Sequence, residues 1–230
     1  MQRSDEPNSN NMIRLQDIDV PKITFSDLKK SGKISFTNLY YNGDSFQIKM
    51  DEKLSLMNAS APSDENPKYA VKFRTNNKEY IQKMYEIENA LHEKFPGKQY
   101  NSMFGKEFWN GDKTLPMSID FNFKFKESEN EERQFSRVDF LDENGIIDES
   151  VNVESFKEGV FTKGTTGNVI FEVAGYEGAG NMGIFFRPQY IKTFSAEEIA
   201  VDKLFSSATA NVKNDLGSDA SRNKRPRIED

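Results

Sequence analysis

The chain has 230 residues, 36% of them hydrophobic and 12% aromatic, which is enough for one β-rich domain with a substantial core. It contains no cysteine and one histidine, so disulfides and thiolate metal sites are excluded and zinc chemistry nearly so. The formal net charge is −6, but residues 127–158 alone hold eleven acidic and three basic side chains, which leaves room for a basic surface elsewhere. No signal-peptide pattern and no long apolar run appears, so we expect a soluble, intracellular protein without a membrane partner.

The two ends of the chain are polar and poor in apolar residues. Residues 1–17 are rich in Asn, Ser, Asp and Gln, and residues 207–230 are similar in character. Segments of this composition cannot bury enough apolar surface to fold alone. We therefore predict disordered tails on either side of a single domain spanning residues 18–206.

The first predicted strands lie in the N-terminal half. Residues 33–41 and 45–50 alternate between apolar and polar residues and flank Asn42-Gly43, a pattern that predicts a β-hairpin. Residues 68–75 alternate likewise, with Tyr69, Val71 and Phe73 on one face of the predicted strand and basic residues on the other.

The hydrophobic period then changes to that of a helix. Apolar residues recur at helical spacing from Tyr80 to Phe95, Asn76 or Asn77 can cap the start, and Pro96-Gly97 follows the end. These features predict a helix at about residues 76–95, followed by an extended loop over residues 97–116.

The C-terminal half again shows strand patterns. Alternation predicts strands at residues 118–125, 134–141, 167–176 and 183–194, and a short amphipathic helix follows, with Ser195 as its cap. Several short strands interrupted by one helix are typical of a small closed barrel. We predict a mainly β fold, an OB-fold-like Greek-key barrel with one inserted α-helix and a short C-terminal helix.

The sequence offers little for catalysis. A Ser-His-Asp or Cys-His site needs a positioned histidine, and His92 lies on the predicted helix, where we interpret it as a solvated side chain. The segment "GYEGAG" lacks the helix that a phosphate-binding loop requires and is interpreted as a hairpin turn. We therefore expect no enzyme activity, no metal and no cofactor, with a carboxylate-dependent nuclease as the remote alternative.

Nucleic-acid binding has the best support in the residue pattern. Several strands present Lys or Arg opposite an apolar face, and the loop after the helix interleaves aromatic residues with lysines. Single-stranded bases stack on aromatic rings while cations follow the phosphates. The alternative for the loop is that its aromatics form a satellite core. The candidate residues are Lys49, Lys68, Lys72, Arg74, Lys98, Tyr100, Phe104, Lys106, Phe108, Trp109, Lys124 and Lys126.

The segment "GIFFRPQYIKTF", residues 183–194, adds further candidates. Pro188 removes a backbone donor, which predicts a strand edge or a bulge at that point. Past such a break the two faces can exchange roles, so we expect Phe186 and Ile191 in the core. The remaining candidates for the nucleic-acid groove are Arg187, Tyr190 and Lys192.

The order of elements resembles that of the single-stranded DNA-binding proteins of DNA viruses and phages, in particular the phage replication type built on an OB-fold. The resemblance covers about residues 30–195, with anchors "KYAVKFRTNNKEYIQKMYEIENALHEKF", "MSIDFNFKFKE", "VDFLDENGIIDE" and "GIFFRPQYIKTF". It implies a protein that coats unwound single-stranded DNA, with RNA as an alternative, during replication or recombination. Replication proteins and further copies of the chain would be its partners. The basic end "RNKRPRIED" departs from the acidic tail of that family.

The same basic end resembles a nuclear import signal, which would place the protein in a host nucleus or at a viral replication site. Its basic residues are Arg222, Lys224, Arg225 and Arg227. The competing function is that of a structural or protein-interaction β-domain, such as a virion or assembly protein, whose aromatic side chains are all buried.

Overall fold

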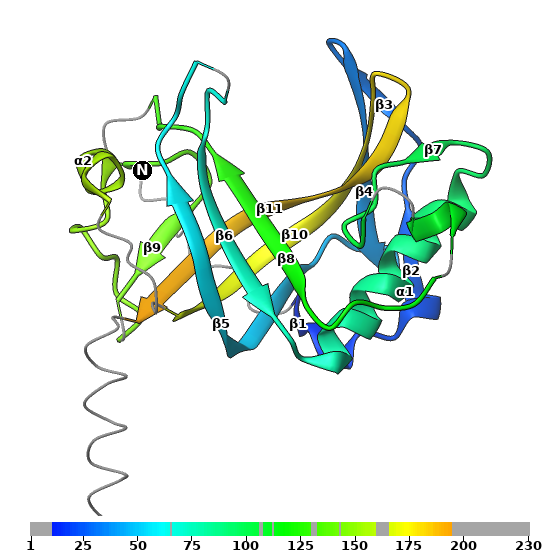
Figure 1. Cartoon of the computed structure of the whole chain (residues 1–230), viewed down its shortest axis with the longest axis horizontal. Coiled ribbons are helices and arrows are strands. Elements are labelled where there is room, and N and C mark those ends of the chain that lie inside the picture. Colours follow the sequence, from blue (N-terminus) through cyan, green and yellow to red (C-terminus); the bar gives the residue numbers. More distant parts are fainter. Residues whose placement is uncertain are drawn as a thin grey trace, which may run out of the picture. The chain divides into compact units, whose positions relative to one another are not determined.

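Alternating apolar residues on five strands build a closed barrel in the computed structural model (Figure 1). The structure describes residues 11–64, 66–105, 108–111, 113–129, 133–142, 144–159 and 166–194. The barrel strands are β5 (Gln47–Ser60), β6 (Tyr69–Thr75), β8 (Ile119–Phe125), β10 (Thr166–Gly178) and β11 (Asn181–Phe194).

The pairing of these strands is that of a Greek-key barrel. Strands β5, β6 and β8 follow one another as antiparallel neighbours, and β10 and β11 form a long antiparallel hairpin. The hairpin closes the barrel at two places, since β10 pairs antiparallel with β5 and β11 pairs parallel with β8 at Phe186 and Phe123. The predicted fold class, a mainly β OB-fold-like barrel with one inserted long helix, is confirmed.

Aromatic rings fill much of the barrel. Phe121, Phe123, Phe171 and Phe186 meet in its interior with ring centroids 5.2 to 6.3 Å apart. A second cluster, in which Tyr69, Phe125, Phe135, Phe140 and Phe156 touch one another, includes one residue of α2 (Val153–Glu158). Such edge-to-face pairs add to the free energy of burial and fix the packing.

Beyond the barrel, β10 and β11 continue into a sheet extension. There β10 pairs with β4 (Ile34–Tyr41), which in turn pairs with β3 (Lys29–Ser31) and β2 (Ile23–Phe25). The helix α1 (Lys78–Lys94) packs on one face of this extension: a Cβ atom added at Gly175 would lie 2.5 Å from Thr37 and 3.0 Å from Leu91. Side chains on the other face of the extension line the candidate site described below.

The predicted helix at about residues 76–95 is present as α1, and Asn77 caps it by accepting hydrogen bonds from the backbone amides of Glu79 and Tyr80. Among the described residues, no helix combines the length and apolar character needed to cross a bilayer. The shorter α2 was not predicted. Its signal was local, since Asn152 and Ser155 form a capping box and Gly159, with φ 72°, ends the helix.

The expectation of disorder over residues 1–17 is wrong for its second part. Residues 12–14 form β1 (Met12–Arg14), parallel to β5, and are followed by the 3-10 turns η2 (Leu15–Asp17) and η3 (Val20–Lys22). Leu15 is fully buried, and Lys83 of α1 donates a hydrogen bond to the Ile18 carbonyl at 2.7 Å. The polar composition of this segment gave no sign that Leu15 is buried or that β1 pairs with β5.

Two strand predictions also need correction. Asn42 and Gly43 do form a tight turn with φ 53° and 87°, but only Tyr41 and Asp44 pair across it. Beyond the turn the two strands separate, because β4 pairs with the second half of β10, whereas β5 pairs with its first half and with β6. The predicted strand 134–141 is reduced to β9 (Asp139–Leu141), since Arg137 adopts φ 68° and interrupts the extended backbone. The predicted turn at "GYEGAG" is confirmed as the tip of the β10–β11 hairpin.

The predicted C-terminal helix after Ser195, the tail 207–230 and its import-like residues Arg222, Lys224, Arg225 and Arg227 lie outside the described residues. The domain boundary at residue 206 lies there too. These stay predictions.

Candidate nucleic-acid interface

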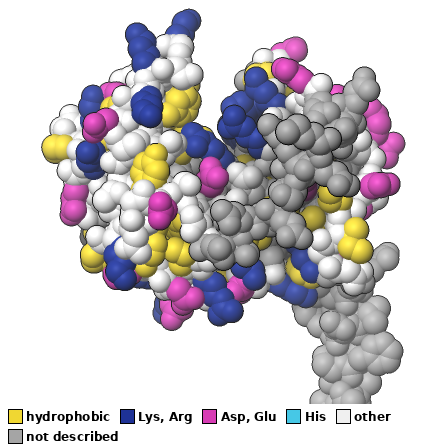
Figure 2. Space-filling view, turned by 180° about the vertical axis from the view of Figure 1, so that it is seen from behind, with side chains coloured by type: hydrophobic (Ala, Val, Ile, Leu, Met, Phe, Trp, Pro, Cys, Tyr) yellow, Lys and Arg dark blue, Asp and Glu magenta, His cyan; other side chains and the backbone are white. Residues whose placement is uncertain are grey.

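An open groove of about 980 Å³ lies between β8 and the sheet extension. We use "the groove" for this cavity, to which β4, β8, β10 and β11 contribute side chains together with the segments at Asn101–Met103 and Ser136–Arg137. Its half-buried aromatic lining residues are Phe36, Tyr176 and Phe185, while Phe125 and Phe186 line it from the core. Its cations are Lys68, Lys124, Lys126, Arg137 and Arg187. Figure 2 shows Lys and Arg side chains gathered on both sides of a hollow in this part of the surface.

Strand register places the three aromatic rings on one face of the extension. Tyr176 of β10 pairs with Phe36 of β4, and Phe185 of β11 pairs with Ala174, two residues before Tyr176. Residues paired across strands share a face, so the rings form one platform. Phe36 and Phe185 contact edge to face at 5.6 Å, and Tyr176 and Phe185 at 6.3 Å. All three are half-buried, with part of each ring open to the groove.

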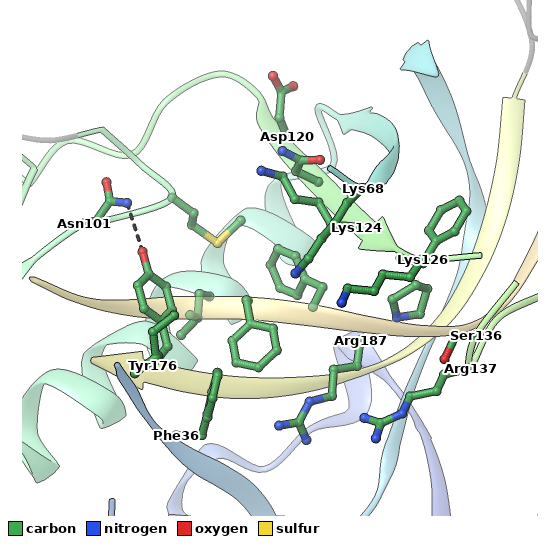
Figure 3. A pocket seen from close by; sticks show the side chains of 18 of the residues that line it. Phe36, Lys68, Asn101, Asp120, Lys124, Lys126, Ser136, Arg137, Tyr176 and Arg187 are labelled. Atoms are coloured by element: carbon green, nitrogen blue, oxygen red, sulfur yellow. Dashed lines mark hydrogen bonds between the residues drawn. The ribbon is translucent and has the colours of Figure 1, made fainter. Parts of the chain in front are cut away.

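The glycine at position 183 leaves room for the Tyr176 ring. A Cβ atom at Gly183 would lie 2.8 Å from the Asn101 carbonyl oxygen and 3.0 Å from the Tyr176 ring. Asn101 in turn donates a hydrogen bond from its side-chain nitrogen to the Tyr176 hydroxyl at 3.0 Å, which Figure 3 shows at one end of the groove. The ring of Tyr176 is thereby held in place.

Alternation on β8 supplies two of the cations. Phe123 and Phe125 point into the core, so Lys124 and Lys126 point out and line the groove. Arg187 donates a hydrogen bond to Asn38 Oδ1 at 3.1 Å, lies 5.0 Å from the Phe185 ring centroid and 3.9 Å from a Glu172 oxygen. In Figure 3 the guanidinium groups of Arg187 and Arg137 point the same way.

Arg137 reaches the groove from a strained backbone. Its φ of 68° lies in the left-handed region, which costs a non-glycine residue free energy. The neighbours on both sides hold it there, because the Ser136 amide donates to the Lys126 carbonyl at 2.8 Å and Val138 is buried. Strain of this kind is concentrated at functional sites.

Asp120 is the one carboxylate among the described residues that line the groove. Arg74 donates to both of its oxygens, at 2.7 and 3.0 Å, and this hydrogen bonding lowers the pKa of Asp120 below its usual range. The charge of Asp120 is compensated from outside the groove. The groove therefore keeps its excess of positive charge, which favours a polyanion.

Four of the candidate residues from the sequence are brought together: Lys68, Lys124, Lys126 and Arg187 all line the groove. The other basic candidates do not. Lys49 pairs with Asp51 at 2.9 Å, Arg74 pairs with Asp120, and Lys98 pairs with Glu177. Lys72 lies on β6 and is also absent from the lining, and Lys106 is outside the described residues.

The prediction for Pro188 is confirmed as a β-bulge. Phe171 pairs with Pro188 and Ile170 with Tyr190, so Gln189 has no partner across the hairpin. Phe186 before the bulge and Ile191 after it are both buried, as expected. Tyr190 and Lys192 lie in the part of β11 that pairs with β9 and do not line the groove, so a nucleic-acid contact at these residues stays a prediction.

The aromatic loop corrects another prediction. Tyr100 and Phe108 are buried, and the Tyr100 hydroxyl donates to the Phe95 carbonyl at 2.8 Å. Trp109 stacks with Tyr85 of α1 at 5.7 Å, and Phe104 contacts the same tyrosine. These rings form the satellite core that was the alternative interpretation, and none of them lines the groove.

The one histidine belongs to this satellite core. The His92 ring is half-buried and lies 4.4 Å from the Tyr100 ring and 4.8 Å from the Trp109 ring. The interpretation as a solvated helix residue was wrong, because the loop folds back over α1. Within the described ranges, no three acidic or histidine side chains are placed to hold a metal ion.

A buried carboxylate anchors the segment that connects this core to the groove. Glu88 of α1 is fully buried and accepts hydrogen bonds from Ser102 Oγ at 3.0 Å and from the Met103 amide at 3.3 Å. Burial raises the pKa of Glu88 to about 7, although these hydrogen bonds oppose the shift. Ser102 and Met103 line the groove, so Glu88 acts as a positioning residue for its wall.

Sequence reasoning missed Phe36, Tyr176, Phe185 and Arg137. A signal existed for Phe185, which shares a strand face with the basic candidate Arg187. The signal for Phe36 was weaker, because β4 carries apolar residues on both faces. The position of Arg137 depends on a left-handed backbone conformation, which no sequence pattern predicted.

Comparison with known proteins yields structural similarity alone. No protein family and no curated protein matches the chain by sequence. The single-stranded DNA-binding protein from bacteriophage Enc34 in complex with ssDNA is similar with a TM-score of 0.40 and 9% identity, covering 76% of this chain and 96% of that one. Its C-terminal truncation gives a TM-score of 0.37 at 11% identity, covering 75% and 95%. A further structure of the same phage protein gives 0.37 at 10%, covering 74% and 88%.

Proposed function

We propose that the chain binds single-stranded DNA in the groove, with little sequence preference and without catalysis. The observation that carries the proposal is the meeting of three half-exposed rings with five cations along one open cavity. Rings supply stacking surfaces for bases, at about 1–3 kcal/mol per base, and cations follow the phosphates. A duplex hides the base faces, so the same cavity favours a single strand.

The weak sequence preference follows from the chemistry of the lining. Every base has a stacking face, and Lys or Arg contacts to phosphate carry no sequence information. Such binding suits a protein that coats unwound strands during replication or recombination, the role that the family resemblance implies. We include that role in the proposal, with phage or viral replication as its setting.

Fluorescence anisotropy of a labelled oligo(dT), compared with a duplex of equal length, tests the proposal. We expect preference for the single strand and an affinity that falls steeply with salt. Trp109 is an unsuitable reporter, because its ring packs on Tyr85 and His92. Equal affinity for the duplex, or no binding at low salt by folded protein, would refute it. Competition with oligo(U) separates DNA from RNA.

A further inference from the structure

The β3–β4 hairpin extends the groove on the side of the aromatic platform. Lys29 of β3 pairs with Phe36 of β4, which pairs with Tyr176 of β10. The three residues therefore stand in one row on the same face of the sheet. Neighbouring strands lie about 4.8 Å apart, so the backbone of Lys29 is only about 10 Å beyond that of Tyr176.

The next row leads to the tip of the hairpin. Ser31 pairs with Ile34, whose side chain lines the groove and is 41% exposed. Gly32, with φ 64°, and Lys33 form the two-residue turn between them. A strand leaving the platform past Ile34 would therefore meet Lys33 at the tip.

The lysines of this hairpin differ in the face on which they lie. Lys29 shares the groove face with Phe36, whereas Lys30 pairs with Ser35, which pairs with Glu177 on the opposite face. All three lysines are exposed, and none forms an ion pair with another described residue. Most candidate cations outside the groove, such as Lys49 and Lys98, already have carboxylate partners. In Figure 2 the projecting region at the upper left, where β3 and β4 lie, carries Lys and Arg side chains.

We propose that Lys29 and Lys33 form a second phosphate-binding site, which holds the DNA strand after its bases have left the aromatic platform. The inference rests on the proposed function of the groove. It adds that the bound DNA runs from the aromatic platform toward the β3–β4 hairpin. Lys30, on the opposite face, takes no part. The site thus lengthens the bound segment without adding a stacking position.

The first test compares Lys29→Ala/Lys33→Ala with Lys30→Ala/Lys78→Ala, which removes the same charge from exposed positions off the groove face. Oligo(dT) of about 15 nucleotides reaches the hairpin, and one of about 5 fills the groove alone. With the long oligonucleotide, we expect the first variant to lose roughly five- to tenfold in affinity and about 1.4 units of salt slope. The control and the short oligonucleotide should change less than about twofold.

Equal losses in the two variants, or an equal loss with both lengths, would overturn the proposal. Failure of the wild-type protein to bind any single strand would instead refute the groove itself, and this result appears before any variant is made. Loss of binding to polyglutamate without loss of DNA binding would assign the hairpin to an acidic protein segment, against the proposal.

A second measurement needs no variant. Acetylation of lysines in the wild-type chain, with and without the long oligonucleotide, should show protection of Lys29 and Lys33 but not of Lys30. Equal protection of all three, or of none, would contradict the assigned face.

Discussion

Two sets of aromatic residues in this protein have opposite roles. The loop rings Tyr100, Phe104, Phe108 and Trp109 are interleaved with lysines in the sequence, yet they pack onto Tyr85 and His92 of α1. The platform rings Phe36, Tyr176 and Phe185 come from three separate strands and open onto the groove. The alternation of aromatic residues with lysines in a loop therefore does not predict that the rings are exposed. The position of a ring on a given face of a strand is a better guide to its exposure.

The largest effect is expected from a loop ring. Phe108→Ala removes a buried side chain and should lower the free energy of unfolding by about 3–5 kcal/mol, measured by urea denaturation. Affinity for oligo(dT), corrected for the folded fraction, should stay within about threefold. If the variant kept normal stability but lost binding, the loop would belong to the DNA interface, contrary to this prediction.

The platform rings should behave in the reverse way. Phe36→Ala and Phe185→Ala should each weaken oligo(dT) binding by about 1–3 kcal/mol, measured by anisotropy, because each removes a stacking surface. Both rings are half-buried, so the loss of stability should be smaller than for Phe108→Ala. Unchanged affinity in the double variant would show that bases do not stack there.

The carboxyl group that joins the two regions should make stability depend on pH. The folded protein holds the Glu88 proton up to about pH 7, whereas the unfolded chain releases it near the ordinary value of 4.5. Stability should therefore fall as pH rises from 5 to 8, by about 2 kcal/mol, and level off above the folded pKa. Tyr100, whose pKa burial raises to about 12, does not titrate in this window.

Glu88→Gln is the matched variant for that measurement, because it keeps the size of the side chain and an acceptor oxygen for Ser102. Its stability should lose most of the dependence on pH between 5 and 8. A wild-type profile that rises over this range, or a variant profile as steep as the wild type, would contradict the assignment.

The smallest effect should come from a cation outside the groove. Lys49→Gln removes a lysine that already pairs with Asp51, which also pairs with Arg14 at 2.8 Å. We expect less than a twofold change in affinity for oligo(dT), against a clear loss and a lower salt slope for Lys126→Gln. Equal losses would mean that net charge, not the groove, governs binding.

The periodic elements of the fold were predictable, and the irregular ones were not. Alternation located β6, β8, β10 and β11, and helical spacing located α1. The buried Leu15 in a polar end, the left-handed Arg137 and the divergence of β4 from β5 depend on contacts between distant residues. For the site, outward alternation found Lys124 and Lys126 but could not tell which basic residues would meet carboxylates such as Asp120 and Glu177.

The unpaired Gln189 has a consequence for how β11 can change over time. Before the bulge the core-facing residue is Phe186, and after it the core-facing residue is Ile191. The extra residue therefore changes which alternate positions of the strand face the core. Substitutions in either half are local events. Deletion of Gln189 would remove the bulge and leave Ile191 opposite Val169, so Phe186 and Ile191 would both stay on the core face. Insertion of one residue elsewhere in the strand would instead exchange the core and solvent faces beyond the insertion.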